Sequence, residues 1–292
     1  MSGAENATKE EQLHNFYLAL NEYGGFISIG LNVFFSRLKQ NFLYICKLIS
    51  LISCMKIALI GYGKMGHTIE EIAKERGHTI VSVIDIDNQG DFDSPQFLSA
   101  DVAIEFSQPQ SAFNNYRKCF ERNIPVVAGT TGWLDHWDEI KNLCTKGNQT
   151  FFYASNYSVG MNVFFALNKC LAKIMNNFPA YDVRMEEVHH IHKLDSPSGT
   201  AISLAGNILE NIDRKKRWKE SSEGTNEDLL IQAKREGEVP GIHEVVYESD
   251  VDEIRIRHSA KNRRGLALGA VMAAEFVKGK KGFLSMNDML DF

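Results

Sequence analysis

Residues 55–66, "MKIALIGYGKMG", decide the fold of most of this chain. An apolar run typical of a strand leads into Gly61, Gly63 and Gly66 at GxGxxG spacing, and a helical pattern follows as far as Gly77. In such a strand-to-helix turn, the first glycine permits the bend, the second lets the backbone approach a pyrophosphate, and the third allows close packing. Free N–H groups at the helix N-terminus favour the phosphate charge. The stretch therefore predicts a dinucleotide-binding turn.

Beyond this turn, short apolar runs alternate with amphipathic stretches, which is typical of parallel α/β units. Strands are predicted in "HTIVSVIDID", "ADVAIEFS", "IPVVAGTTG" and "TFFYASNYSVG", with a helix in "QSAFNNYRKCFERN". The character then changes. A helix is predicted over 159–175, a strand in "YDVRMEEVHHIH", a helix from about Thr200, a solvated polar loop over 213–228, two alternating strands, and a final helical segment.

Composition limits the classes of function. The 292 residues are 44% hydrophobic, so they can bury the core of one large domain or of two. The net charge of −5 provides no positive field for nucleic acid or an anionic membrane. Five cysteines without a CxxC motif argue against a disulfide framework and a cysteine-ligated zinc, so a cytoplasmic location is expected.

The first 54 residues differ from the rest of the chain. Their apolar runs are interrupted by basic residues, so none reaches the length of a membrane-spanning helix, and they do not have the order of a signal peptide. We expect residues 1–54 to be an extension outside the fold, with Met55 as the natural start.

Asp85 indicates which dinucleotide is bound. It ends the second predicted strand about 20 residues beyond the glycines, where a carboxylate hydrogen-bonds the adenine ribose hydroxyls. The carboxylate would repel a 2′-phosphate and Ile86 supplies no cation, so NADH is preferred, while Lys64 and His67 soften the preference and allow NADPH. A glycine turn that serves packing alone is the alternative. The segment "AGTTG" also follows a predicted strand at the carboxyl edge of the sheet. The nicotinamide half of the cofactor is expected near its residues Gly129, Thr130 and Thr131.

The stretch "EEVHHIHKLDSPSGTA", residues 186–201, gathers three histidines and a lysine ahead of a predicted helix. It suits an anion-binding, proton-donating pocket, because His189 and Lys193 supply charge and a transferable proton. Consecutive strand side chains point to opposite faces, so His189 and His190 should lie at a strand-to-loop boundary. A metal site and a surface cluster are the competing interpretations. At the start of the helix, N–H groups and a hydroxyl favour a carboxylate: Ser198, Gly199 and Thr200.

With both motifs in one chain, the sequence from Met55 to Phe292 closely resembles the dihydrodipicolinate reductase family. The segments "GYGKMG", "AGTTG", "ASNYSVGMN", "EEVHHIHKLDSPSGTA", "REGEVPGIHEV" and "GFLSMNDML" occur in the family's order. The resemblance implies reduction of 4-hydroxy-tetrahydrodipicolinate to tetrahydrodipicolinate in lysine and diaminopimelate synthesis. Hydride would come from nicotinamide C4, with protonation by the His189 and Lys193 site.

The family's residue roles carry over position by position. The resemblance makes His189 and Lys193 catalytic, and it implies substrate contacts from His190, Ser198, Gly199, Thr200 and Arg263, although Arg264 adjoins the last of these. The implied cofactor contacts are Gly61, Tyr62, Gly63, Lys64, Met65, Gly66, Asp85, Gly129, Thr130, Thr131, Ala154, Ser155, Asn156 and Tyr157. The stretch after Asp85 is shorter than is usual in the family, which puts cofactor preference in doubt more than chemistry.

We therefore expect an α/β protein with a Rossmann dinucleotide-binding domain over 55–157 and 263–292. A smaller α+β domain with a mixed sheet, over 158–262, would bind substrate and form a homotetramer. The expected partner is a small dicarboxylate, with no metal, nucleic acid or membrane. Two rivals remain: another Rossmann oxidoreductase acting on a small acidic substrate, and a non-enzymatic dinucleotide sensor.

Overall fold

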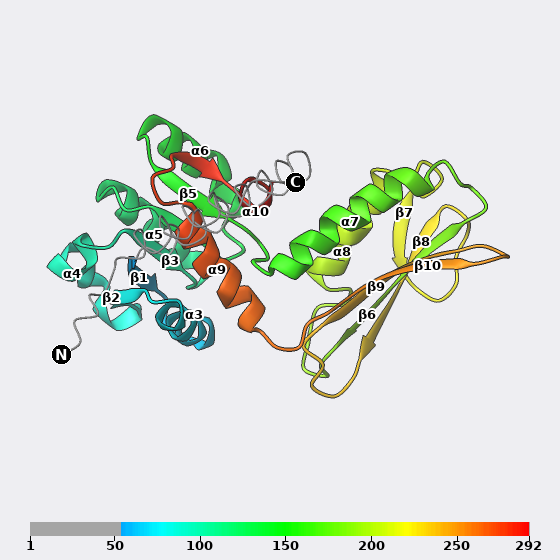
Figure 1. The fold of residues 1–292 in the computed structure, drawn as a ribbon, viewed down its shortest axis with the longest axis horizontal. Helices are drawn as coiled ribbons and strands as arrows, with labels where there is room; N and C mark the ends of the chain where they lie inside the picture. Colours follow the sequence, from blue (N-terminus) through cyan, green and yellow to red (C-terminus); the bar gives the residue numbers. More distant parts are fainter. Residues whose placement is uncertain (1–53, 292) are drawn as a thin grey trace, which may run out of the picture. The chain divides into compact units, whose positions relative to one another are not determined.

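The computed structural model describes residues 54–291, which form two β-sheets with helices packed against them (Figure 1). The expectation for residues 1–54 lies almost entirely outside this range. No helix among the described residues is both long and apolar enough to cross a membrane.

The first sheet has six strands in the order β11-β5-β4-β3-β1-β2, and every pair is parallel. Read from β2, the order is the doubly wound 2-1-3-4-5 arrangement extended by β11, a Rossmann-like sheet with its topological switch point between β1 and β3. The strands are β1 (Lys56–Ile60), β2 (Thr79–Ile84), β3 (Val102–Glu105), β4 (Val126–Ala128), β5 (Thr150–Tyr153) and β11 (Gly282–Leu284).

Helices cover both faces of this sheet, so its strands are apolar on both sides. Ile57 and Leu59 of β1 face a core with Ala270, whereas Ala58 and Ile60 face a core with Tyr116. The first core lies under α3 (Lys64–Glu75) and α9 (Arg264–Phe276), and the second under α5 (Pro109–Glu121) and α6 (Trp137–Lys146). The shorter helical elements are η1 (Ile86–Asp93), α4 (Pro95–Leu98), η2 (Leu134–His136) and α10 (Met286–Leu290).

The second sheet is mixed, as predicted, with strand order β10-β9-β6-β8-β7. The two pairs on the β10 side are antiparallel and the two on the β7 side are parallel. Helices α7 and α8 pack on one face, where Phe164, Leu204 and Tyr247 share a buried core. The elements are α7 (Val159–Met175), β6 (Asp182–His189), α8 (Gly199–Leu209), β7 (Arg217–Glu220), β8 (Asp228–Arg235), β9 (Ile242–Glu248) and β10 (Glu253–Ser259).

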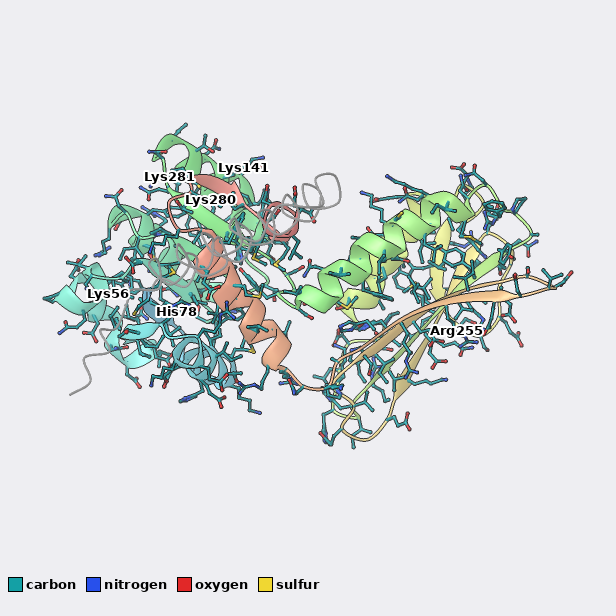
Figure 2. The ribbon with its side chains drawn as sticks, in the orientation of Figure 1. Lys56, His78, Lys141, Arg255, Lys280 and Lys281 are labelled. Atoms are coloured by element: carbon teal, nitrogen blue, oxygen red, sulfur yellow. The ribbon has the colours of Figure 1, made fainter. Side chains whose placement is uncertain are left out.

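The opposite face of the second sheet carries charges. Arg255 of β10, labelled in Figure 2, pairs with Glu244 of β9 at 2.6 Å and with Glu253 at 2.8 Å. Alternation explains this, because Ile254, Ile256 and His258 of the same strand point to the helix-covered face. The boundaries predicted for the two domains stay a prediction.

The interpretation of residues 213–228 as a solvated loop is wrong in part. The segment contains β7, an edge strand, and Lys215 is buried with its Nζ donating to the carbonyl oxygen of Asp228 at 2.9 Å. Its polar composition reflects ion pairing of Arg217 and Lys219 with the buried Asp228 carboxylate, at 2.6 and 2.8 Å. Strand β7 lies at the edge of the sheet, and two of its four residues form ion pairs with Asp228. It therefore lacks the alternating apolar pattern by which strands are predicted.

Candidate functional site

A cavity of about 600 Å³ lies at the carboxyl ends of β1, β2 and β3, where open α/β sheets bind ligands. Each glycine of the turn has the predicted constraint. A Cβ at Gly61, where φ is 88°, would lie 2.2 Å from the carbonyl oxygen of Phe106, and one at Gly66 would lie 2.5 Å from the carbonyl oxygen of Gly61. Gly63 has nothing within 4 Å of its Cβ position, so its backbone is open to a ligand. The cavity therefore fits a dinucleotide.

Asp85 lines the same cavity at the end of β2. Its carboxylate accepts a hydrogen bond from the N–H of Ile86 at 2.9 Å and caps η1, and the residue remains exposed. Tyr62 is also in the lining, whereas Lys64 is not, and no lysine or arginine lines this cavity within the described part of the chain. The carboxylate thus lies in the cavity wall without a neighbouring cation.

A second cavity, of about 230 Å³, lies beside the β4 turn. It brings together Met65 of the glycine turn and the predicted group at Gly129, Thr130 and Thr131. Gly129 is required there, because a Cβ would lie 2.1 Å from the ring of Phe106.

The turns that follow β3 and β4 are held together by hydrogen bonds. The N–H of Ser107 donates to Oγ1 of Thr130 at 2.8 Å, and the Ser107 hydroxyl donates to the buried carboxylate of Glu105, whose pKa is raised by burial. The turn that carries Thr130 is therefore fixed from inside the sheet.

Of the four cofactor contacts predicted after β5, residues 154–157, only Asn156 lines one of the three cavities of this site. Asn156 lines a third cavity, and its Oδ1 accepts from the N–H of Ser158 at 2.9 Å. The Tyr157 side chain is buried, with its hydroxyl donating to the carbonyl oxygen of Ala128 at 2.8 Å, so a ligand contact there would come from the backbone. Ala154 is buried and Ser155 exposed, and neither lines that cavity.

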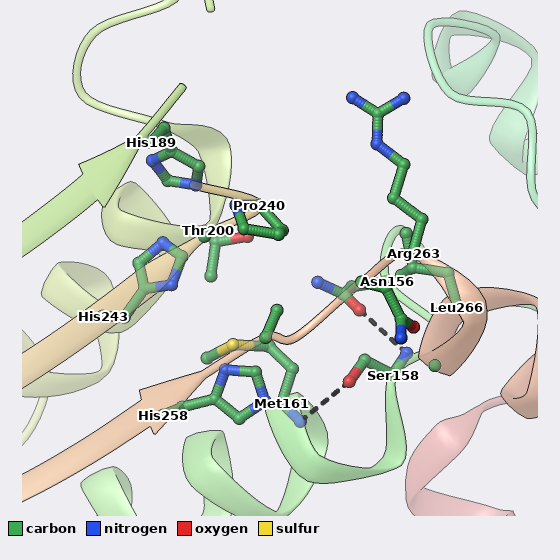
Figure 3. Close-up of a pocket in the computed structure, with 14 residues that line it drawn as sticks. Asn156, Ser158, Met161, His189, Thr200, Pro240, His243, His258, Arg263 and Leu266 are labelled. Atoms are coloured by element: carbon green, nitrogen blue, oxygen red, sulfur yellow. Dashed lines mark hydrogen bonds between the residues drawn. The ribbon is translucent and has the colours of Figure 1, made fainter. Parts of the chain in front are cut away.

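The third cavity, of about 160 Å³, is lined by His189 and Thr200 of the histidine segment (Figure 3). Its wall brings together imidazoles from β6, β9 and β10, the Thr200 hydroxyl at the start of α8, and Arg263 ahead of α9. Arg264 pairs instead with Glu71 and Glu75, at 2.8 and 2.7 Å, which distinguishes the two arginines. The imidazoles are those of His189, His243 and His258.

Strand register explains why these imidazoles meet. Glu187 of β6 is opposite His243 of β9, and His243 is opposite His258 of β10, so the three form a row across neighbouring strands. His189 follows two residues after Glu187 on the same face of β6. A single register therefore places one carboxylate and three imidazoles side by side.

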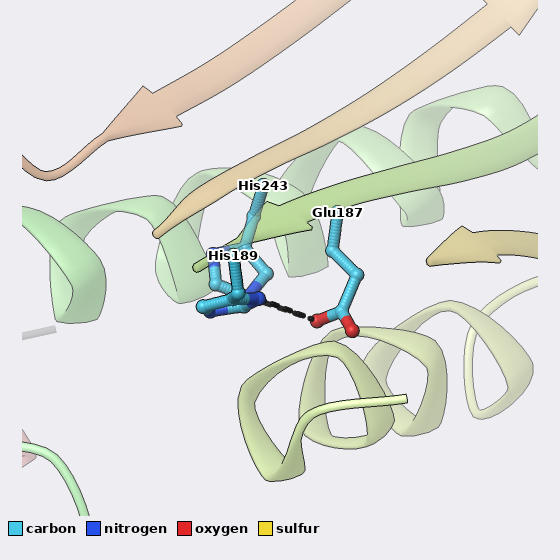
Figure 4. Close-up of side chains that lie close together, drawn as sticks. All are labelled: Glu187, His189 and His243. Carbon is cyan, nitrogen blue, oxygen red and sulfur yellow. Dashed lines mark ion pairs between the residues drawn. The ribbon is translucent and has the colours of Figure 1, made fainter. Parts of the chain in front are cut away.

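Burial governs the ionisation of this group. It lowers the pKa of His189 to about 4, although Glu187 opposes the shift, so the imidazole is neutral at pH 7 in the absence of a ligand. Burial would raise the pKa of Glu187, but the adjacent His243 imidazole and the hydrogen bonds from Ser198 outweigh it and lower that pKa to about 2. Figure 4 shows the contact of 3.5 Å between Nδ1 of His189 and the Glu187 carboxylate. A bound dianion would raise the pKa of His189 towards neutrality.

The other residues predicted for this site lie outside the cavity wall. The Lys193 ammonium donates to Asp195 at 2.6 Å, and Ser198 is buried with its hydroxyl donating to Glu187. Strand β6 ends at His189, so His190 begins the loop, which confirms the predicted strand-to-loop boundary. Gly199 is the first residue of α8 and does not line the cavity.

Glu187, His243 and His258 were not predicted from the sequence. Two features of the sequence could have indicated them. Glu187 lies two residues before His189, on the same face of a strand, and "GIHEV" and "RIRHSA" each carry one histidine in a strand with alternating apolar residues. Neither feature shows that the strands are neighbours.

Glu187, His189 and His243 each place one possible metal-ligand atom, a carboxylate oxygen or a ring nitrogen, within 4.8 Å of the other two. This spacing is compatible with a bound metal ion. Ser198 already donates to the carboxylate, and the Arg235 guanidinium lies 3.4 Å from it, which opposes a cation. The expected absence of a metal stays a prediction.

Three comparisons relate the chain to known proteins. The family descriptions "Dihydrodipicolinate reductase, N-terminus" and "Dihydrodipicolinate reductase, C-terminus" match residues 55–157 and 160–290. A Christiangramia forsetii protein named 4-hydroxy-tetrahydrodipicolinate reductase is 52% identical over 236 residues, which cover 81% of this chain and 98% of that protein. A protein of the same name from Clostridium tetani is 34% identical over 253 residues, covering 81% and 97%.

Among solved structures, the dipicolinate-bound dihydrodipicolinate reductase from Paenisporosarcina sp. TG-14 shares the fold with a TM-score of 0.66. It is 21% identical and covers 81% of this chain and 99% of that one. An amine dehydrogenase from Mycobacterium smegmatis follows at a TM-score of 0.53 and 11% identity, covering 81% and 96%.

Proposed function

The chain belongs to the dihydrodipicolinate reductase family, and from this premise we propose that it reduces 4-hydroxy-tetrahydrodipicolinate to tetrahydrodipicolinate with NADH or NADPH. The reaction belongs to lysine and diaminopimelate synthesis. The family resemblance predicted from the sequence is confirmed, and so is the prediction that the protein is an oxidoreductase. The observation that carries the proposal is the cavity that joins His189, Thr200 and Arg263.

The names of substrate and product define the stoichiometry. A ring hydroxyl is replaced by hydrogen, so one hydride and one proton are consumed and one water is released. When bound by the glycine turn and the β4 turn, a reduced dinucleotide would supply the hydride from C4 of its nicotinamide. His189 supplies the proton from a buried wall of the cavity, once the charge of the substrate has raised its pKa.

Recognition of the two carboxylates comes from groups of complementary charge. The free N–H groups at the N-terminus of α8 and the Thr200 hydroxyl bind one carboxylate, and the Arg263 guanidinium binds the other. Ser198, with its hydroxyl already used by Glu187, contributes by holding this helix start in place.

His190, the first residue after β6, would add a donor to the substrate. Lys193 provides the second proton-donating group once its ion pair with Asp195 is broken. A dianionic substrate can compete for the ammonium at little cost, because ion pairs near the surface contribute little free energy.

The cofactor site favours NADH. Asp85 faces the ribose position without a cation in the wall, and it would oppose the 2′-phosphate of NADPH. The remaining cofactor contacts come from the glycine turn, the β4 turn and the backbone after β5.

We assign residues 55–157 and 263–292 to the dinucleotide domain and 158–262 to the substrate domain. The charged face of the second sheet, which no described helix covers, is the contact surface of a homotetramer. Light scattering on a size-exclusion column tests the assembly.

The test of function is NADH oxidation with 4-hydroxy-tetrahydrodipicolinate generated enzymatically in the assay. The protein should turn it over, and His189→Gln should lower kcat by roughly 100-fold or more, the range for general acid catalysis, with NADH affinity unchanged. Oxidation of NADH with another acidic substrate alone would identify a different oxidoreductase. Binding of NADH without turnover of any substrate would identify a sensor.

A further inference from the structure

We propose that Glu187 is the positioning residue of the site: its carboxylate fixes the tautomer of His189, stabilises its imidazolium, and ties it to the helix that binds the substrate carboxylate. The inference rests on the proposed reductase function. It concerns a residue that the sequence pattern did not single out.

Glu187 is a fully buried carboxylate with several donors directed at it. Oε1 accepts from the N–H of Ser198 at 3.0 Å, and Oε2 accepts from the Ser198 hydroxyl. Nε2 of His243 lies 3.6 Å from Oε2, and the Arg235 guanidinium lies 3.4 Å from Oε1. A buried carboxylate supported in this way stays ionised, so it presents a fixed negative charge to its neighbours.

The neighbour that lacks any other partner is Nδ1 of His189. This atom is buried without a hydrogen bond in the described structure, and it lies 3.5 Å from Oε2 of Glu187. The distance is somewhat longer than a hydrogen bond, as is common in active sites that tighten when the substrate binds. In the neutral ring, the proton is therefore favoured on Nδ1.

The other ring nitrogen is the one that reaches the substrate. Nε2 of His189 lies against Gly241, where a Cβ would be only 3.1 Å away, and both residues line the cavity. With Nδ1–H directed at Glu187, Nε2 takes a proton from solvent and gives it to the substrate. The carboxylate stabilises the charged ring meanwhile, as the acidic member of a hydrolase triad does.

Ser198 extends the effect to the substrate. Its hydroxyl and N–H both donate to Glu187, and its hydroxyl oxygen accepts from the N–H of Ala201 as the cap of α8. One carboxylate thus fixes both the proton donor and the helix N-terminus that faces the substrate. The distance between acid and carboxylate binder is set by this shared partner.

The charges around His189 come from four elements. Glu187 on the same strand favours the charged ring, whereas His243 on β9, Lys193 in the following loop and Arg235 on β8 disfavour it. Among these groups Glu187 alone supports protonation, so neutralising it should lower the pKa of the donor.

The experiment compares Glu187→Gln with Glu186→Gln. Glu186 is the matched control, because it lies on the same strand, points to the opposite face, and pairs with Lys234 at 2.6 Å. We expect Glu187→Gln to lower kcat by roughly 10- to 100-fold, while the KM for NADH stays within a factor of two of that of Glu186→Gln. The alkaline limb of the kcat profile, which reports the enzyme–substrate complex, should move by at least about one unit to lower pH.

Ser198→Ala separates this role from a purely structural one. It removes the hydroxyl that donates to Glu187 and caps α8, but leaves the backbone N–H bond and the carboxylate beside His189. The substrate KM should therefore rise while the alkaline limb stays in place. If Glu187→Gln behaves like Ser198→Ala, with an unmoved limb, Glu187 only supports the helix and the proposal is wrong.

A measurement on the unaltered protein covers the case in which Glu187→Gln does not fold. Long-range ¹H–¹⁵N spectra should show the neutral His189 ring protonated at Nδ1, and a ring protonated at Nε2 would overturn the proposal. Failure of the reductase function appears separately, as absence of turnover in the unaltered protein.

Discussion

Gly241→Ala tests how tightly the strand-bound imidazole of His189 is confined. A Cβ at this position would lie 3.1 Å from Nε2 of His189 and 3.4 Å from its Cδ2, and the first distance is tighter than an ordinary contact. The ring must therefore move by a few tenths of an ångström, away from the position from which it reaches the substrate.

The size of the effect follows from this displacement. A misplacement of 1 Å costs about 100-fold in rate, or about 2.7 kcal/mol. A shift of about 0.3 Å then costs about 0.8 kcal/mol, so kcat should fall roughly 4-fold. Gly241 also has a φ of 156°, which residues with side chains rarely adopt. This strain should cost about 1–3 kcal/mol of stability, or several degrees of Tm.

The matched control is Gly237→Ala in the same loop. Gly237 has a φ of 46° but nothing within 4 Å of its Cβ position, so the substitution strains the backbone without crowding the ring. Both variants should melt earlier by circular dichroism, and only Gly241→Ala should lose kcat in the NADH oxidation assay at saturating substrate. Equal kcat values for the two variants would show that Gly241 does not confine His189.

Four further outcomes are expected. Asp85→Asn should reduce the ratio of kcat/KM for NADH over NADPH by about 10-fold, because a carboxylate near a 2′-phosphate costs at least about 1 kcal/mol in water; an unchanged ratio would exclude Asp85 from the choice. Thr200→Val should raise the substrate KM by roughly 5- to 100-fold, since a buried carboxylate loses a donor, and an unchanged KM would count against the contact. Asp228 has its pKa lowered chiefly by a hydrogen bond from a lysine, so its contribution to stability is present above about pH 4 and lost as pH falls. Calorimetry should accordingly show that Asp228→Asn lowers Tm at pH 7 and by progressively smaller amounts as the pH falls below about 4, and a loss of Tm that does not change with pH would contradict the ion pairing. Gly269→Ala should cost about 3 kcal/mol or more in urea unfolding, because its Cβ would lie 1.7 Å from a backbone carbonyl oxygen, whereas Gly265→Ala, at 3.8 Å from its nearest neighbour, should fold normally.

The elements that could be predicted are those with a clear local pattern. Helix α7 begins and ends where the apolar periodicity places it, and strands β1 to β5 of the first sheet are the apolar runs of the sequence. Strands β7, β8 and β11 and helices α4, α6 and α10 escaped prediction. For β7 the reason is that Arg217 and Lys219 satisfy a buried Asp228 carboxylate, so charge occupies positions that a strand pattern reserves for apolar residues.

In the site, the roles of the glycine turn and of the first turn of α8 could be predicted from the sequence, because each depends only on residues adjacent in the chain. Gly61 and Gly66 constrain one turn, and Thr200 lies in the first turn of a helix, so their roles depend on a few consecutive dihedral angles. The role of Lys193 came from the residue pattern and the resemblance, and that of His190 from the resemblance alone. Both stay proposals, since Lys193 is paired with Asp195 and both residues lie outside the cavity wall.

By itself, the sequence of this protein determined that a dinucleotide turn precedes a segment able to bind an anion and donate a proton. Only the tertiary structure decided which groups surround His189, because Glu187, His243 and His258 meet through the pairing of three strands distant in sequence. Local conformation depends on adjacent residues, whereas cross-strand register depends on the burial of the whole sheet face. The protonation of His189 is set by that register, and so it belongs to the folded chain rather than to the motif.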